Sequence, residues 1–215
     1  MSEGFLVSLC GLDGAGKTTQ ARRLGRWLDE LGVLAALEAR EGPGIVRQVL
    51  QTLADRSGLA EHADLLGPDQ THLVKAFMRL RDWTETVVPG LARPGFVVTD
   101  RAPVCHYAAV RADGASNEGV LRQVLGLLPV PDLVIYLQVA PADAYARLTA
   151  RGHSAERLAY LIANEQAYRG LPEFPEFVAV DGTGDVDAVH RAVRNQLTAR
   201  WPALTAGLPQ PAARG

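Results

Sequence analysis

A lysine, a threonine and three glycines lie close together in "GLDGAGKT", from Gly11 to Thr18. Gly11, Gly16, Lys17 and Thr18 match G-x-x-x-x-G-K-[ST], the pattern of loops that wrap around a polyphosphate. In such a loop, backbone N–H groups surround the phosphates, the lysine neutralises their charge and the hydroxyl ligates Mg²⁺. The chain has only one other lysine, Lys75, so this lysine does not belong to a lysine-rich background. The pattern predicts a site for ATP and Mg²⁺.

Several classes of protein use this kind of loop. GTPases also need a guanine-reading N-K-x-D segment, and Lys75 lies instead in "LVKAF". ABC-type ATPases are longer and carry a signature of their own, which this sequence lacks. A kinase for a nucleotide or another small molecule remains, together with a protein that binds ATP as a switch without turnover.

Five apolar runs bounded by turn residues predict buried strands at residues 5–10, 33–37, 95–99, 133–139 and 177–180. Helical periodicity predicts helices at residues 18–32, 68–89, 117–128, 141–151, 155–168 and 187–200. Continuous apolar strands that alternate with amphipathic helices favour a parallel sheet covered on both faces. The expected fold class is α/β, a P-loop NTPase with three α/β/α layers, a five-stranded parallel sheet and a short lid.

Length and composition point to one soluble domain. The chain has 215 residues, 47% of them hydrophobic, which suits a single core over residues 1–205 followed by a flexible tail at 206–215. A net charge of -2 gives no positive field for nucleic acid. The N-terminal apolar run is too short for a membrane helix, so a cytoplasmic protein without a membrane partner is expected. Cys10 and Cys105 show no redox or metal spacing, and reduced thiols are expected.

The stretch "GLDGAGKTTQ" resembles the thymidylate kinases. "VVTDRAP", "PDLVIYLQVAPADAYARLTARG" and "VAVDGTGDVDAVHRAV" are similar to later segments of that family, so the resemblance extends to about residue 200. It implies transfer of the ATP γ-phosphate to a deoxynucleoside monophosphate, most simply dTMP to dTDP, by a homodimer.

The resemblance also implies roles for individual residues. The ATP-binding residues would be Gly11, Gly14, Ala15, Gly16, Lys17, Thr18, Thr19 and Arg147. Asp13 would contact the acceptor sugar and belong to the catalytic group with Lys17. Asp100 would organise Mg²⁺ with Thr18, and Arg101 would hold the acceptor phosphate. A lid at about 150–158 would bring Arg151 and Arg157 to the transferred phosphoryl group.

The acceptor side departs from the family pattern. The resemblance places Arg79, His106 and Tyr107 near the base and sugar, and Arg40 and Glu41 nearby. Lys75, however, stands where the family has a stacking aromatic residue, and Ala102 replaces the aromatic residue after Asp-Arg. These residues also fit purely structural roles. Arg79 would then lie on a solvated helix face, and the Tyr107 ring would pack against its neighbours. A modified nucleotide, a nucleoside or another metabolite therefore stays open as the acceptor.

Overall fold

The computed structural model describes residues 4–39, 45–60, 62–152 and 158–202. Its centre is a parallel sheet of five strands in the order β2-β3-β1-β4-β5. The strands are β1 (Phe5–Cys10), β2 (Leu34–Glu38), β3 (Phe96–Asp100), β4 (Leu133–Gln138) and β5 (Val178–Asp181). The five apolar runs therefore form the five strands, each displaced by no more than one residue at its start. The predicted α/β class and parallel sheet are confirmed.

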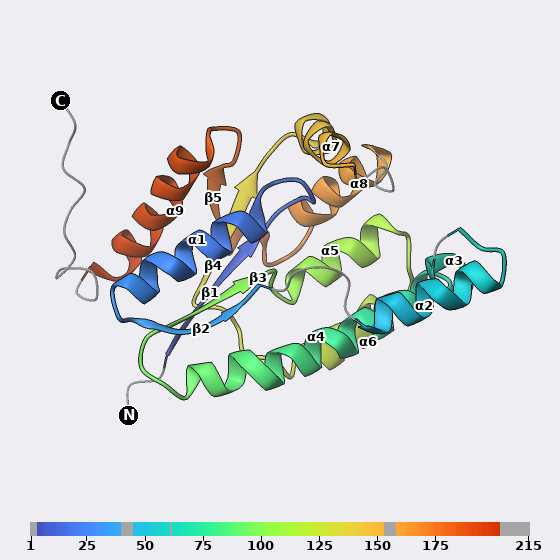
Figure 1. Ribbon diagram of the computed structural model, residues 1–215, viewed down its shortest axis with the longest axis horizontal. Coiled ribbons are helices and arrows are strands. Elements are labelled where there is room, and N and C mark those ends of the chain that lie inside the picture. The colour runs from blue at the N-terminus through green and yellow to red at the C-terminus, as the bar shows by residue number, and fades with distance from the viewer. Residues whose placement is uncertain (1–3, 40–44, 61, 153–157, 203–215) are drawn as a thin grey trace.

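Helices cover both faces of the sheet (Figure 1). They are α1 (Lys17–Glu30), α2 (Ile45–Arg56), α3 (His62–Leu66), α4 (Pro68–Leu91), α5 (Val104–Ala112), α6 (Glu118–Leu125), α7 (Pro141–Ala150), α8 (Leu158–Arg169) and α9 (Val186–Arg200). The first and last, α1 and α9, pack against each other on one side, whereas α4 packs on β2 and β3 from the other. No helix within the described residues is long and apolar enough to cross a membrane.

The helices differ from the sequence-based expectation in two ways. The periodicity predicted no helix at α2 or α3. It also extended the helix at 117–128 too far, because α6 ends at Leu125. Beyond that point Leu127 is 77% exposed, whereas Leu128 is buried in the core outside the helix. Gly126 is the C-terminal cap residue, and its amide donates to the Arg122 carbonyl.

Strand register decides which loops meet. Leu9 of β1 pairs with Asp100 of β3, and the Arg101 amide donates to the Leu9 carbonyl at 3.0 Å. Cys10 pairs with Tyr136 of β4 on the other side. The glycine-rich loop and the Asp100–Arg101 corner therefore leave the sheet side by side at its carboxyl edge, where open parallel sheets bind ligands.

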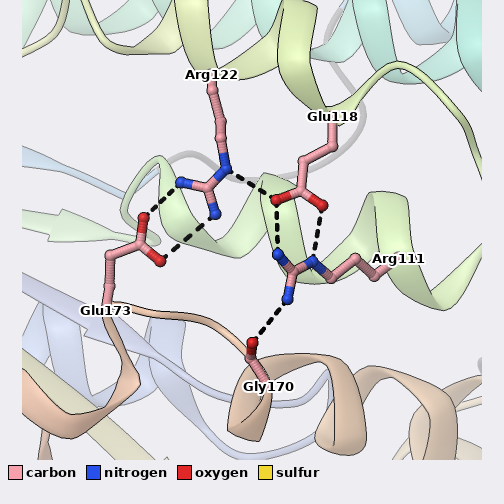
Figure 2. A network of polar contacts seen from close by, with 5 residues as sticks. All are labelled: Arg111, Glu118, Arg122, Gly170 and Glu173. Carbon is pink, nitrogen blue, oxygen red and sulfur yellow. Dashed lines mark hydrogen bonds and ion pairs between the residues drawn. The ribbon is translucent and has the colours of Figure 1, made fainter.

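A network of ion pairs joins α5, α6 and the segment after α8 (Figure 2). The Glu118 carboxylate accepts from Arg111 Nε at 2.7 Å and from Arg122 Nε at 2.8 Å. Arg122 Nη1 donates to Glu173 Oε1 at 2.5 Å, and Arg111 Nη1 donates to the Gly170 carbonyl at 2.8 Å. Glu118 is thus the anion shared by both arginines, and its loss leaves one of them without a carboxylate in this network.

We expect Glu118→Ala to lower the free energy of unfolding by about 1 kcal/mol, because a partly exposed network is screened by solvent. The matched control is Glu85→Ala, which removes a carboxylate from the exposed Arg81–Glu85 pair on α4. The control should cost no more than about 0.5 kcal/mol. Urea unfolding of both variants measures the difference, and equal losses would contradict a cooperative role for Glu118.

Candidate active site

The glycine-rich loop forms an open anion cradle at the start of α1. No side chain caps this helix, and its first turn contains no acidic residue. The N-cap Gly16 has φ of 95°, and Gly14 has φ of 87°, in the region that favours glycine. A Cβ on Gly14 would also collide with the Ala144 carbonyl oxygen of α7. The loop therefore keeps the N–H end of α1 accessible to an anion, with α7 packed directly behind it.

Lys17 lies inside this loop. Its side chain is only 4% exposed, and its ammonium donates to the Leu12 carbonyl at 2.7 Å and lies 3.3 Å from Asp13 Oδ1. Burial, followed by the charge of Arg101, lowers the pKa of Lys17, whereas Asp13 opposes that shift. A buried ammonium held within the loop by a backbone carbonyl and a carboxylate is well placed to interact with phosphate oxygens.

Asp13 connects the loop to the Asp100–Arg101 corner. Its carboxylate accepts a hydrogen bond from the Arg101 guanidinium as well as contacting Lys17. Burial raises the pKa of Asp13, but the charges of Arg101 and Lys17 outweigh burial and hold it well below its usual value. Arg101 has φ of 86°, the one positive φ outside glycine within the described chain. Such strain at a non-glycine residue is typical of functional sites.

The ionised Asp13 carboxylate should make stability pH-dependent. Its pKa is lower in the folded state than in the unfolded state, so its contribution is complete above about pH 4 and lost as the pH falls below that value. We expect Asp13→Asn to be about 1–2 kcal/mol less stable than the parent at pH 7. The difference in unfolding free energy between the parent and Asp13→Asn should become steadily smaller as the pH falls toward 3. Urea unfolding across this pH range measures it, and a gap independent of pH would contradict the ionised pair.

Asp100 and Thr18 form the metal-side pair. The Thr18 hydroxyl donates to Asp100 Oδ2, and Asp100 Oδ1 is buried without a hydrogen-bond partner. Among the described residues, no group of three or more His, Cys, Asp or Glu side chains could hold a metal ion. Mg²⁺ is commonly held by one or two protein oxygens, waters and substrate phosphates. The hydroxyl and the unsatisfied carboxylate oxygen fit such an ion.

A second cationic group lies beyond Arg101. Arg79 of α4 donates to Glu38, the last residue of β2, at 2.8 Å, and the two side chains are 14% and 5% exposed. The pKa of His106 is well below its usual value because of burial first and then the charges of Arg79 and Arg101. His106 is therefore neutral at pH 7 and lies within reach of both charges. Glu38 was missed by sequence reasoning, although a carboxylate ending an apolar strand was a signal for it.

The remaining predicted residues are distributed more widely. Tyr107 is buried with the Arg122 guanidinium 4.1 Å above its ring, which places it toward α6. Arg147 of α7 donates to the Thr183 carbonyl at 3.4 Å, so α7 contacts the loop that precedes α9. Arg151 caps the end of α7 and is exposed, as is Thr19 on α1. Arg40, Glu41, Arg157 and most of the expected lid lie outside the described residues.

The chain matches the model of the thymidylate kinase family over residues 9–193. It belongs to the thymidylate kinase family. The thymidylate kinase of Caldanaerobacter subterraneus subsp. tengcongensis is 28% identical over 88% of this chain and 93% of the relative. That of Xanthomonas oryzae pv. oryzae is 30% identical over 99% of this chain and 91% of the relative. The resemblance carried by the loop and the later segments is thus confirmed over nearly the full length.

Proposed function

We propose that this protein transfers the γ-phosphate of ATP to a deoxynucleoside monophosphate, with dTMP as the preferred acceptor and dTDP as the product. The observation that carries the proposal is the convergence of Lys17 and Arg101 on Asp13 at the carboxyl edge of the sheet. One cation belongs to the phosphate loop, and the other directly follows the neighbouring strand β3. A donor and an acceptor phosphate would therefore meet between them.

The chain's own residues perform three tasks in this proposal. The loop amides and Lys17 bind the β- and γ-phosphates of ATP, and Arg101 binds the acceptor phosphate and aligns it with the γ-phosphorus. Asp13 keeps both cations in place until the substrates bind. Mg²⁺, held near Thr18 and Asp100, supplies charge neutralisation on the donor phosphates. No general base is required, because an acceptor phosphate oxygen is already ionised at neutral pH.

The acceptor base would lie toward Arg79 and His106. A neutral imidazole donates through one nitrogen and accepts through the other, so it suits the mixed donors and acceptors of a pyrimidine edge. Because this residue differs from the family pattern, a modified nucleotide is the second candidate acceptor. We also propose that residues 1–205 act as one kinase domain and that the protein is a homodimer, on the basis of family membership.

The test is an ADP-release assay with Mg-ATP against dTMP, dUMP, dCMP, dAMP, dGMP and thymidine. We expect the highest kcat/KM with dTMP. Transfer only to a hydroxyl of thymidine would replace the proposal with a nucleoside kinase. ATP binding without ADP formation for any acceptor would indicate a nucleotide switch and overturn the proposal.

The Arg79 guanidinium offers a matched test of the acceptor site. We expect Arg79→Met to raise the KM for dTMP by about 10- to 100-fold, because it removes a buried cation oriented by Glu38. Arg81→Met removes the same charge two residues along α4, where the side chain is exposed and pairs with Glu85. That control should leave the KM unchanged. Equal KM values in the two variants would exclude Arg79 from acceptor binding.

A further inference from the structure

The fold brings the only two cysteines of the chain into contact. Cys10 ends β1 directly before the phosphate loop, and Cys105 lies in the first turn of α5, four residues after Arg101. Their Sγ atoms are 3.2 Å apart, and both side chains are buried. A disulfide has an S–S length of about 2.05 Å, so bond formation requires the sulfurs to approach by only about 1 Å.

The surroundings favour a thiolate at Cys105. Burial alone raises its pKa, but a hydrogen bond with Cys10, the Arg101 charge and a hydrogen bond with Tyr168 outweigh burial and lower it below the usual value. Burial raises the pKa of Cys10, which therefore remains a thiol beside the thiolate. An electropositive setting next to a second thiol is one feature of cysteines that oxidise reversibly. Such cysteines are also accessible to solvent, whereas Cys10 and Cys105 are 0% and 5% exposed, so peroxide must reach this pair through local opening of the fold.

We propose that Cys10 and Cys105 form a reversible intramolecular disulfide that lowers phosphoryl transfer when the protein meets a peroxide. The loss of activity in this proposal rests on the proposed kinase function, whereas disulfide formation does not. The site is an oxidative modification site built into the junction between the phosphate loop and the Asp100–Arg101 corner.

The chemistry balances with hydrogen peroxide as the oxidant. The Cys105 thiolate attacks one peroxide oxygen, the O–O bond breaks, and hydroxide leaves and takes up a proton to give water and a sulfenic acid. The Cys10 sulfur then attacks the Cys105 sulfur, the S–O bond breaks, and the Cys10 proton leaves with the hydroxyl as a second water. Two thiols are oxidised by two electrons and one peroxide is reduced to two waters.

The disulfide acts on catalysis through the two segments that it joins, the start of the phosphate loop and the segment from Arg101 to Cys105. Cys10 is bonded to Gly11, where an added Cβ would lie 2.7 Å from the Leu137 carbonyl oxygen, so the backbone at this end of the loop packs closely against β4. The adjustment therefore falls on the first turn of α5, which follows the segment that holds Arg101 at its positive φ. Because a 1 Å misplacement at a reacting centre can cost about 100-fold, we expect kcat to fall by about 10- to 100-fold.

The experiment treats the full-length reduced protein with hydrogen peroxide and measures intact mass without reductant, thiols alkylated after denaturation, and kcat. We expect a mass lower by two hydrogens, no alkylated thiol, and a kcat that dithiothreitol restores. Cys105→Ser and Cys10→Ser should each keep the activity of the reduced parent and lose the peroxide response. Thermal unfolding checks that each variant is folded. One folded variant is sufficient to test whether the peroxide response needs both cysteines.

The readouts separate the two proposals. Two free thiols after treatment, or a disulfide between two chains on a non-reducing gel, would overturn the modification site. An intramolecular disulfide with unchanged kcat would overturn its regulatory role. Absence of transfer to any nucleoside monophosphate by the reduced protein would refute the proposed function, while the mass measurement would still decide whether the disulfide forms.

Discussion

Lys17→Met is expected to reduce kcat/KM for ATP-dependent phosphoryl transfer by about 10³-fold. Lys17 is the buried cation of the phosphate loop, and methionine fills similar volume without charge. Negative charge builds up on the departing ADP oxygens as the bond to the γ-phosphorus breaks, so losing a preorganised cation beside them costs more in the transition state than in the ground state. The effect should therefore lie mainly in kcat, measured by ADP release at saturating substrates.

The matched control for Lys17 is Arg26→Met on the exposed face of the same helix, which removes one positive charge far from the loop lining. It should retain parent activity. Thermal unfolding distinguishes a catalytic loss from a folding loss, because Lys17→Met also leaves Asp13 with only its Arg101 contact. A folded Lys17→Met protein with kcat within about tenfold of the parent would contradict the assigned role.

The second large effect is expected from Asp100→Asn. The asparagine oxygen can still accept the Thr18 hydrogen bond, so the pair's geometry survives while the negative charge is lost. We expect kcat to fall by about 100-fold and the Mg²⁺ concentration for half-maximal activity to rise by about tenfold, as for other residues that orient a metal's ligands. Initial rates measured at increasing Mg²⁺ and fixed ATP give both quantities.

Asp29→Asn is the charge-matched control, because this exposed carboxylate lies at the other end of α1. It should show the parent's Mg²⁺ dependence. If Asp100→Asn lowered kcat with an unchanged Mg²⁺ dependence, Asp100 would be a positioning residue for Thr18 rather than a group that serves the metal.

The sequence by itself determined the local parts of this protein. A strand, a glycine-rich loop and a helix are consecutive in the chain, so residue order alone was enough to predict the phosphate site. The apolar runs predicted the strands for the same reason, since burial of a whole strand requires apolar side chains on both faces. Helices α2 and α3 were not predicted, and the periodicity extended α6 past Gly126, because Leu127 and Leu128 continue the apolar pattern after the helix has ended.

The tertiary structure alone decided which distant residues meet. Asp13 and Arg101 are separated by 88 residues, and Cys10 and Cys105 by 95. The spacing of the cysteines indicated reduced, unrelated thiols, yet the parallel pairing of β1 with β3 brings their sulfurs into contact. Glu38 likewise reaches Arg79 only because β2 lies beside β3, under α4. Parallel pairing joins strands that are distant in sequence, and a one-residue change of register would turn these side chains to the opposite face.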